Sequence, residues 1–346
     1  MIRVLVVDDS AVMRAFLSRV VSTQSDMEVV GVAADPLVAI ELIRLKSPDV
    51  LTLDVEMPRM NGLEFLRKLM ALQPLPVIMV SSLTRQGADI TMQALEFGAV
   101  DFVAKPAELS QFEASANEIV EKIRAANSAR VVRYRPREPA VPVAPAAPVR
   151  ITQQVPSLDR LIAIGASTGG VEALREILAA LPQRMPPIVI AQHMPAGYTE
   201  AFARRLNTIC RLDVKQAQDG EAALDGVAYI APGGRHLTVL RRASAYSLRV
   251  SDEPPVNRHR PSVDSLFRSV ARAASGRAIG VMLTGMGADG AEAMLDLSSG
   301  GAYTLAQDEA SCVVFGMPRK AISIGAVREV LPLGQIARRL IELSAG

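Results

Sequence analysis

Apolar and polar positions along the first third of the chain switch repeatedly between two periodicities. Short β-branched runs such as IRVLVV, EVVGVA and PVIMVS are each followed by a segment with helical spacing. In the first such segment, SAVMRAFLSRVVS, the side chains of Met13, Phe16, Leu17 and Val20 fall on one face of a helix. Short strands that alternate with helices indicate a parallel sheet covered on both faces. Residues 1–125 are therefore predicted to form one α/β domain.

The alternation stops after this domain and then resumes. Residues 126–157 include the run RYRPREPAVPVAPAAPVRITQQVP, which has no periodicity and predicts an extended, semi-rigid linker. Within residues 158–346, strand candidates such as RLIAIGA, PPIVIAQH and AIGVMLTG return, with helices predicted near 171–180, 199–209 and 263–274. The pattern predicts a second, doubly wound α/β domain with a mostly parallel sheet. The run HLTVLRRASAYSLRVSDE predicts an antiparallel hairpin at its edge.

Composition narrows the class of protein. A chain of 346 residues exceeds one typical core, which agrees with two domains. The net charge of +2 does not favour a nucleic-acid partner, and no apolar run is long enough to cross a membrane. The amino terminus has the pattern of a strand rather than of a signal peptide, so we expect a cytoplasmic protein. The two cysteines, Cys210 and Cys312, have neither disulfide-framework nor zinc spacing.

In the first domain, charged and hydroxyl side chains follow four strands at the point where each ends. Asp8 and Asp9 follow the first strand, Asp54 the third, Ser81 ends the fourth, and Lys105 follows the fifth. Parallel strands end at one edge of the sheet, where open α/β sheets bind ligands. Gathered carboxylates repel one another, and a hard cation such as Mg²⁺ relieves this repulsion. Taken singly, the aspartates also fit a helix cap and a turn.

In the second domain, the run LIAIGASTGG ends a strand in a turn of small residues. Residues 165–169 satisfy G-x-S-x-G, a strand, tight turn and helix that expose a serine hydroxyl. The helix that follows directs free N–H groups at this turn, which favours developing negative charge. The motif by itself fits a packing turn or a phosphate site as well as a nucleophile, so Ser167 needs a base nearby.

Two further strand ends supply the groups that a nucleophilic serine requires. His193 follows the strand in PIVIAQHMP, and Asp289 follows the strand in AIGVMLTGMGADG. A histidine can take the proton of Ser167, and a carboxylate can orient the imidazole. The order Ser–His–Asp differs from that of the α/β-hydrolases, so the sequence argues against that superfamily. The backbone N–H of Met286 is the candidate oxyanion donor.

Two alternatives belong to other functional classes. GMGADG also fits the dinucleotide motif G-x-G-x-x-G, with Asp308 as a possible ribose contact, but this interpretation leaves Ser167 and His193 unexplained. In the second alternative, the second domain only binds a partner and has no catalytic activity. The complete set of serine, histidine and aspartate argues against this alternative.

The first domain resembles a response-regulator receiver over its whole length, through VVDDS, LDVEMPRMNGLEFL, MVSS and GAVDFVAKP. The resemblance implies a flavodoxin-like fold and phosphorylation of Asp54 by a histidine kinase. It implies that Asp8, Asp9, Asp54 and the Glu56 carbonyl hold Mg²⁺. Ser81 and Lys105 would contact the phosphoryl group, and Phe102 occupies the position of the aromatic switch.

The two domains together resemble the CheB family of chemotaxis protein-glutamate methylesterases. The motifs IGASTGG, AQHMP, YIAPGGRHL, PPVNRHRPSVDSLF and LTGMGADGA appear in the family's order. The resemblance implies hydrolysis of γ-glutamyl methyl esters, and deamidation of glutamines, on cytoplasmic helices of methyl-accepting chemoreceptors, without a catalytic cofactor. Ser167 becomes the nucleophile, His193 the base and Asp289 the orienting acid, with Thr168 and Met286 lining the pocket. The kinase is then one of the chemotaxis type, and the unmodified receiver is expected to cover the active site.

The remaining histidines and two arginines have more than one interpretation. His236 and His259 shape the substrate groove, or serve the fold. Arg258 and Arg260 face acidic receptor helices, or are solvated.

Overall fold

The computed structural model describes residues 1–57, 61–82, 84–106, 112–129, 131, 160–242 and 245–345. Most of the predicted linker, 126–157, lies outside these described residues. Within them no helix is both long and apolar enough to span a bilayer.

The first domain is a five-stranded parallel sheet between two layers of helices. The strand order is β2-β1-β3-β4-β5. Helices α1 and α5 bury their apolar faces on one side of the sheet, and α2, α3 and α4 on the other. The elements are β1 (Ile2–Val7), α1 (Ala11–Ser22), β2 (Met27–Ala33), α2 (Pro36–Lys46), β3 (Val50–Asp54), α3 (Gly62–Leu72), β4 (Val77–Ser81), α4 (Arg85–Glu96), β5 (Asp101–Ala104) and α5 (Phe112–Asn127).

The second domain is a seven-stranded parallel sheet, again covered on both faces. Helices α6, α7 and α11 pack on one face, and α8, α9 and α10 on the other. Together the two sheets confirm the predicted α/β fold class. The elements are β6 (Leu161–Ala166), α6 (Gly170–Ala180), β7 (Ile188–Gln192), α7 (Tyr198–Ile209), β8 (Asp213–Gln216), β9 (Val227–Ile230), β10 (His236–Arg242), β11 (Ala245–Ser251), α8 (Val263–Ala274), η2 (Ser275–Arg277), β12 (Ala278–Met282), α9 (Ala291–Ser299), β13 (Tyr303–Gln307), α10 (Met317–Ser323), β14 (Glu329–Leu331) and α11 (Leu333–Ala345).

The predicted hairpin is present as β10 and β11, but it forms a separate two-stranded sheet instead of extending the edge of the main one. Its inward side chains, among them Leu237, Val239 and Leu248, join the core around α8. The Val239 N–H donates to Ser269 Oγ of α8 at 2.9 Å. The hairpin is therefore held by packing on a helix, because its apolar face finds a partner there.

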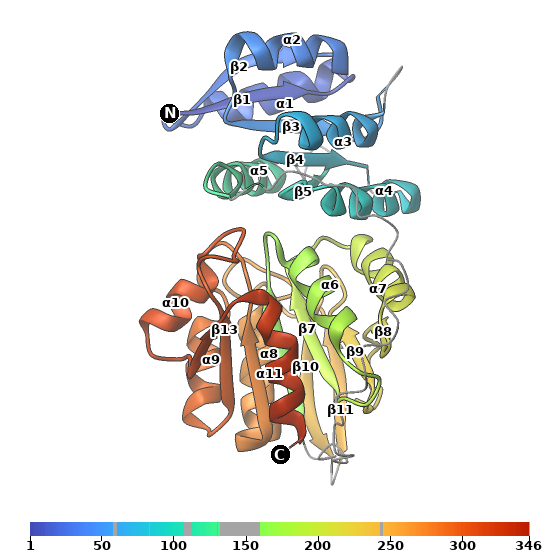
Figure 1. Ribbon diagram of the computed structural model, residues 1–346, viewed down its shortest axis with the longest axis vertical. Helices are drawn as coiled ribbons and strands as arrows, with labels where there is room; N and C mark the ends of the chain where they lie inside the picture. The colour runs from blue at the N-terminus through green and yellow to red at the C-terminus, as the bar shows by residue number, and fades with distance from the viewer. Residues whose placement is uncertain are drawn as a thin grey trace.

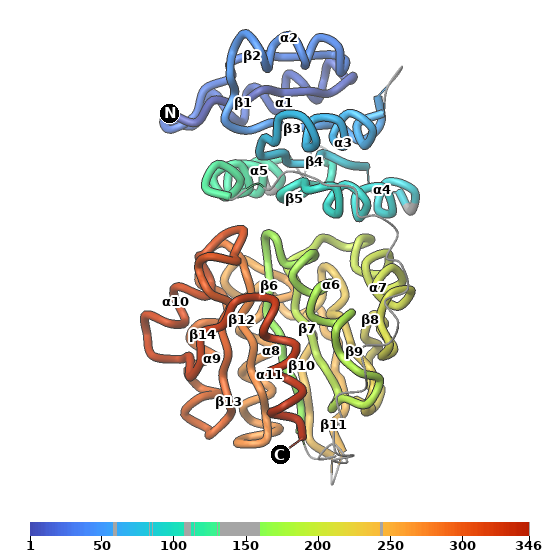
Figure 2. Tube along the Cα trace, in the orientation of Figure 1, coloured from blue at the N-terminus to red at the C-terminus, as the bar shows by residue number. Residues whose placement is uncertain are grey.

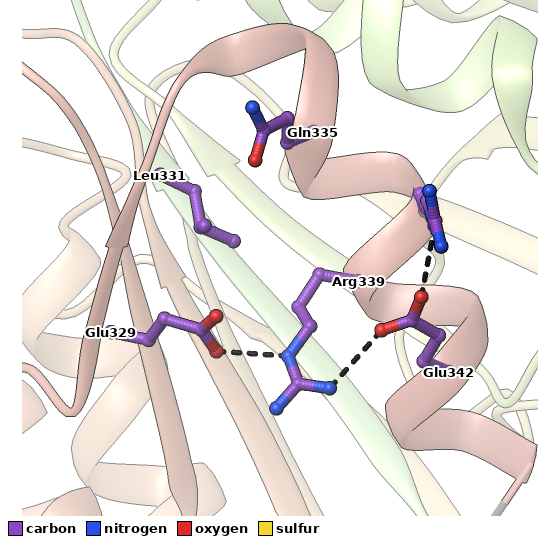
Figure 3. Close-up of a pocket in the computed structure, with 6 residues that line it drawn as sticks. Glu329, Leu331, Gln335, Arg339 and Glu342 are labelled. Atoms are coloured by element: carbon purple, nitrogen blue, oxygen red, sulfur yellow. Dashed lines mark hydrogen bonds and ion pairs between the residues drawn. The ribbon is translucent and has the colours of Figure 1, made fainter.

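Two short strands and the last helix were not predicted. The strand β8 has the polar sequence DVKQ and β14 has three residues, so neither carries a clear period-two signal. Figure 3 shows how α11 is joined to the edge strand β14, with Arg339 between Glu329 and Glu342. The Arg339 guanidinium donates to Glu329 at 2.8 Å and to the Tyr303 hydroxyl at 2.8 Å. A cavity of about 450 Å³ lies beside these residues, and the charged side chains that line it form ion pairs with one another.

The order of the large sheet determines where a ligand can bind. The sequence of strands is β14-β13-β12-β6-β7-β9-β8, so the chain runs outward from β6 in both directions. Figure 2 shows β6 and its neighbours β12 and β7 in the middle of the domain. In open α/β sheets the crevice at such a reversal, outside the carboxyl ends of the strands, is the usual binding site.

The two domains are stacked so that this crevice faces the first domain. In Figure 1 the edge formed by α4, β5 and α5 lies directly above the second domain. Side chains cross between them: Arg204 of α7 pairs with Asp89 of α4 at 3.2 Å, and Arg205 pairs with Glu96. The Phe102 ring of β5 packs against Tyr198 of α7 with centroids 4.4 Å apart.

Candidate active site

The three predicted catalytic residues lie at the ends of adjacent strands. Ser167 directly follows β6, His193 directly follows β7, and Asp289 lies in the loop between β12 and α9. Since β6 pairs with β7 on one side and β12 on the other, the fold brings these loops to one edge. The structure thus places together three side chains that are separated by up to 122 positions in the sequence.

A chain of hydrogen bonds joins the three. The distance from Ser167 Oγ to His193 Nδ1 is 3.2 Å, and that from His193 Nε2 to Asp289 Oδ2 is 2.8 Å. The carboxylate only accepts, so Nε2 carries the proton and Nδ1 presents its lone pair to the serine hydroxyl. The imidazole is thus in the tautomer that a base for Ser167 requires.

Asp289 is held from several directions. Its Oδ2 also accepts from the Val263 N–H at 2.7 Å, and its Oδ1 accepts from Ser262 Oγ and Asn257 Nδ2, each at 2.9 Å. Burial by itself raises the pKa of Asp289, but the hydrogen bonds from His193, Asn257 and Val263 outweigh it and lower the pKa to about 2. The carboxylate therefore remains charged and fixed beside the imidazole.

The ring of His259 stacks on that of His193. The centroids of the two rings are 3.8 Å apart, and the angle between the ring planes is 12°. Burial, followed by the proximity of His193, lowers the pKa of His259 to about 4, so its ring is neutral at physiological pH. A neutral platform supports His193 without opposing the positive charge that a base acquires.

Three contributors to this site were not predicted as such. Asn257 and Ser262 hold Asp289, and His259 was weighed only as part of the groove or of the fold. A signal existed for Ser262, because a serine before the apolar period of α8 indicates a helix cap, and its Oγ indeed accepts from the Ser265 N–H. No local pattern indicates that Asn257 reaches Asp289, 32 residues away.

Two of the other three residues of uncertain role, His236 and Arg260, have structural partners. His236 is buried, with Nε2 donating to the Pro254 carbonyl at 3.1 Å and Nδ1 accepting from the Ser262 N–H at 3.3 Å. Arg260 donates to the carbonyl oxygens of Asp252 and Glu253 at 3.1 and 3.3 Å. Both residues hold the segment that leads into α8.

The serine turn depends on the absence of side chains around it. A Cβ on Gly285 would lie 2.7 Å from Ser167 Cβ, and one on Gly170 would lie 2.1 Å from Gln192 Oε1. Gly169 has φ +79°, which favours glycine. Gln192 fixes the turn by donating from Nε2 to the Ser167 carbonyl at 2.9 Å. The small residues therefore let two backbone segments meet at the nucleophile.

A cavity of about 510 Å³ opens beside Ser167 and is lined by both domains. Thr168 and Met286 line it, as predicted from the resemblance, together with Glu118 and Glu121 of α5. The Thr168 hydroxyl donates to Asp101 Oδ2 of the first domain at 2.5 Å. Among the described residues the Met286 N–H has no hydrogen-bond partner, as a donor kept for a substrate oxygen would require.

The glycine-rich loop has contacts that differ from those of a dinucleotide site. Asp289, inside the motif, is committed to His193 and its other donors. Asp308 closes its own turn, since its Oδ1 accepts from the Ser311 N–H at 2.9 Å and from Ser311 Oγ at 2.6 Å. Through Asp289 the loop contributes instead to the hydrogen-bond chain with His193 and Ser167.

The first domain gathers its predicted acidic residues at the ends of β1 and β3. Ligand oxygens of Asp8, Asp9 and Asp54 all lie within 4.8 Å of one another. Lys105 Nζ lies 3.1 Å from Asp8 Oδ2 and 2.8 Å from Asp54 Oδ2. The pKa of Asp54 is raised to about 6, mainly by burial and also by the negative charge of Asp8. The nearby Lys105 lowers this pKa, but its effect is smaller.

This set fits a divalent cation. Asp8 Oδ2 and Asp54 Oδ2 are buried and accept no hydrogen bond of good geometry, although Lys105 lies close. Buried carboxylate oxygens that face a lysine ammonium without a well-aligned hydrogen bond remain available as the hard ligands that Mg²⁺ takes. Glu56, whose carbonyl was assigned to the same ion, lies beside them, and its N–H donates to Asp54 Oδ1 at 3.2 Å.

Ser81 and Phe102 link this site to the second domain. The Ser81 hydroxyl donates to the Gly87 carbonyl at 3.3 Å and is thus engaged within its own loop. The Ser81 carbonyl accepts from the Tyr198 hydroxyl at 3.3 Å, and Phe102 packs on the same tyrosine. Both predicted receiver positions therefore contact α7 through one residue, Tyr198.

Comparisons with known proteins identify a different family domain in each half of the chain. The CheB methylesterase family matches residues 162–340, and the response regulator receiver domain matches residues 4–117. A protein-glutamate methylesterase/protein-glutamine glutaminase of Pectobacterium atrosepticum is 56% identical over 100% of this chain and 98% of its own. The Salmonella typhimurium protein of the same name is 53% identical with the same coverage.

A solved structure agrees as well. The catalytic domain of the Thermotoga maritima CheB methylesterase is 39% identical over 53% of this chain and 98% of its own, with a TM-score of 0.52. The family match, the full-length relatives and the fold confirm the family and the methylesterase function that the sequence motifs predicted. The chain belongs to the CheB family: it is a protein-glutamate methylesterase and protein-glutamine glutaminase of chemotactic adaptation, with a phosphorylatable receiver domain.

Proposed function

We propose that Ser167, His193 and Asp289 perform the hydrolysis of γ-glutamyl methyl esters. The observation that carries this assignment is the continuous hydrogen-bond chain from the serine hydroxyl through the imidazole to the buried carboxylate. A serine hydroxyl is a weak nucleophile at neutral pH and needs an adjacent base, which His193 Nδ1 supplies. Asp289 keeps the proton on Nε2 and stabilises the imidazolium that forms.

The reaction has two halves. Ser167 Oγ attacks the ester carbonyl while its proton passes to His193 Nδ1, and a tetrahedral oxyanion forms. When the carbon–oxygen bond to the methoxy group breaks, Nδ1–H protonates the leaving oxygen and methanol departs. Nδ1 then takes a proton from water, the resulting hydroxide attacks the acyl-enzyme, and Ser167 Oγ leaves with that proton. The products are a glutamyl carboxylate and the regenerated serine.

The oxyanion is stabilised by the backbone at the pocket wall. The Met286 N–H, free of partners among the described residues, is the proposed donor. Removal of one such donor in other hydrolases costs about 2.7–4 kcal/mol of transition-state stabilisation. A glutamine side chain passes through the same tetrahedral state with ammonia as the leaving group, so one site serves both substrates. No cofactor takes part in these steps.

The nucleophile is tested by the substitution Ser167→Ala. We expect methanol release from methylated chemoreceptor membranes to fall by at least about 10⁴-fold, since residues of a triad act as a unit. Ser299→Ala, at the exposed end of α9, is the matched control and should retain full activity. Substantial methanol release by Ser167→Ala would discard the assignment.

For the receiver, we propose Asp54 as the phosphoryl acceptor. Asp8, Asp9, Asp54 and the Glu56 carbonyl would hold Mg²⁺, which neutralises charge on the carboxylates and the phosphoryl oxygens. Lys105, already 2.8 Å from Asp54 Oδ2, would contact the phosphoryl group, and Ser81 would turn from the Gly87 carbonyl toward it. The donor is a histidine kinase of the chemotaxis type.

This second assignment has its own test. Asp54→Asn removes the acceptor oxygen while preserving size, so incubation with acetyl phosphate and Mg²⁺ should label the wild-type chain and not the variant. Asp89→Asn on α4 is a control of the same chemical change outside the acidic cluster. Equal labelling of Asp54→Asn would overturn the assignment.

The substrates we propose are the cytoplasmic helices of methyl-accepting chemoreceptors, and the protein would act in the cytoplasm. We further propose that the unmodified receiver limits access to Ser167. In support, α5 supplies Glu118 and Glu121 to the cavity that contains Ser167 and His193.

A further inference from the structure

A tight turn lies at the mouth of the active-site cavity. Val256 and His259 exchange two backbone hydrogen bonds, of 3.1 and 2.9 Å, around Asn257 and Arg258. Asn257 has φ +51° and Arg258 has φ +68°. Two successive left-handed residues other than glycine are uncommon, and such strain persists where the surroundings enforce it, often at functional sites.

Two of the turn residues are committed to the catalytic set. Asn257 donates to Asp289 Oδ1 at 2.9 Å and to Asp264 Oδ2 at 2.5 Å. His259 stacks on His193. The turn therefore has a fixed orientation relative to the reacting atoms, and whatever its apex holds is held at a defined distance from Ser167.

Arg258 occupies the apex and points away from the core. Its side chain is 85% exposed, and its Nη1 lies 3.0 Å from Glu121 Oε1 of α5 in the receiver. The neighbouring Arg260 donates to two backbone carbonyls of its own segment. Within the described part of the chain, Arg258 reaches a carboxylate of another domain and Arg260, the other arginine weighed as a contact for acidic helices, does not.

The partner that meets Arg258 in this structure is helical. Helix α5 presents Asn117, Glu118 and Glu121 to the cavity that also contains Ser167. The mouth thus accommodates one face of a helix, and a carboxylate on that face meets the guanidinium. An exposed ion pair of this kind stabilises only weakly, so another carboxylate can replace Glu121 there.

We propose that Arg258 binds a carboxylate of the substrate helix, and that Glu121 of α5 occupies its place in the unphosphorylated chain. The inference rests on the proposed function. Residues three or four apart share a helix face, so the recognised acid lies three or four positions from the target glutamyl ester. Arg258 is then a specificity-determining residue, and α5 is a competing mimic of the substrate.

The first experiment varies substrate and arginine together. Methylated cytoplasmic fragments of a chemoreceptor are prepared with the acids three and four residues from the target retained, replaced by Gln, or replaced by Lys. For the intact wild-type chain we expect kcat/KM to be about two- to fivefold higher on the acidic fragment, through KM. Arg258→Asn should abolish this preference, and Arg258→Asp should favour the lysine fragment. Both replacements tolerate left-handed backbone, so the turn is retained.

The second experiment tests the mimic. Glu121→Gln in the intact, unphosphorylated chain should raise kcat/KM on the acidic fragment about two- to fivefold more than on the glutamine fragment. Asp89→Asn is the matched control, because it removes another exposed ion pair between the domains, that with Arg204, away from the cavity. Any change caused by Asp89→Asn should be equal on both fragments.

The outcomes separate this inference from the function on which it rests. Methanol release from none of the fragments by the wild-type chain would overturn both. Equal kcat/KM on the three fragments in the wild type and in both Arg258 variants would overturn the recognition of a substrate carboxylate alone. A kcat loss in Arg258→Asn that is equal on all fragments would likewise overturn it, since that result describes a merely structural turn.

Discussion

At the scale of single residues, the proposed catalytic set of Ser167, His193 and Asp289 is oriented mainly by one segment. Residues 257–263 contribute the Asn257 amide, the stacked ring of His259, the Ser262 hydroxyl and the Val263 N–H. Such groups fix the imidazole and carboxylate within the narrow limits that catalysis demands. The same segment contains His259, and its lowered pKa leads to a prediction for how folding stability depends on pH.

Folding stability should depend on pH through His259. Because its pKa is lowered to about 4 in the folded chain, the unfolded chain binds a proton near pH 6.5 that the folded chain does not yet bind. Stability is therefore fully present above about pH 6.5 and is lost as the pH falls toward 4. The loss from this group between pH 7 and 4.5 is about 2 kcal/mol.

The variant His259→Phe keeps a ring for stacking and removes the titration. Urea denaturation at pH 7 and 4.5 should show that the wild-type chain loses about 2 kcal/mol more than the variant. The comparison cancels the carboxylates Asp8 and Asp54, whose raised pKa values act in the opposite direction. Parallel losses in the two proteins would contradict the prediction.

At the scale of elements, the site depends on how closely the loops after β6 and β12 approach one another. The Ser167 N–H donates to the Thr284 carbonyl at 3.0 Å, and Gly285 lies against the Ser167 side chain. The small residues of GASTGG and TGMGADG thus allow the loops after β6 and β12 to contact each other.

Gly285→Ala should damage activity more than stability. Its Cβ would lie 2.7 Å from Ser167 Cβ and 2.4 Å from Met317 Sδ, so the nucleophile must shift. A displacement of about 1 Å can cost about 100-fold in rate, whereas overpacking costs about 1–3 kcal/mol of stability. Methanol release and thermal unfolding measure the two effects. Gly276→Ala, whose Cβ would have ordinary 3.5 Å contacts, is the control, and equal activity of the two variants would refute the steric argument.

At the scale of the whole molecule, receiver and catalytic domain share contacts that start next to the proposed phosphorylation site. Tyr198 of α7 touches both Phe102 and the Ser81 carbonyl, and Thr168, next to the nucleophile, donates to Asp101. A phosphoryl group that draws Ser81 toward Asp54 would disturb the first of these contacts. The interface is therefore placed to respond to charge at Asp54.

Deletion of residues 1–150 should raise the basal activity. Without α5 the cavity loses its receiver wall, so methanol release from receptor membranes should exceed that of the intact, unphosphorylated chain. The Thermotoga maritima catalytic domain was solved by itself, which supports folding of this part alone. Adding a phosphodonor should stimulate the intact chain and leave the truncated one unchanged. A truncated enzyme no faster than the intact chain would contradict occlusion.

Much of the fold and of the site was predictable from local patterns. Alternating periodicities identified both α/β domains, and the residues at strand ends included Asp54, Ser167 and His193. This succeeded because parallel strands end at one edge, so positions at strand ends converge whatever their separation in the sequence. The strands β8 and β14 were not predicted, because they are too polar or too short to show the period-two pattern of a strand.

By itself, the sequence determined the α/β class, the resemblance to the family and the three candidate side chains at strand ends, because these follow from short-range patterns and strand polarity. That β6 lies between β7 and β12 was decided by the tertiary structure. Only the tertiary structure decided that Asn257 and His259 support the triad, that the hairpin packs on α8, and that Arg258 meets Glu121. These contacts join segments with no common periodicity. They exist because distant surfaces pack together, which no local pattern records.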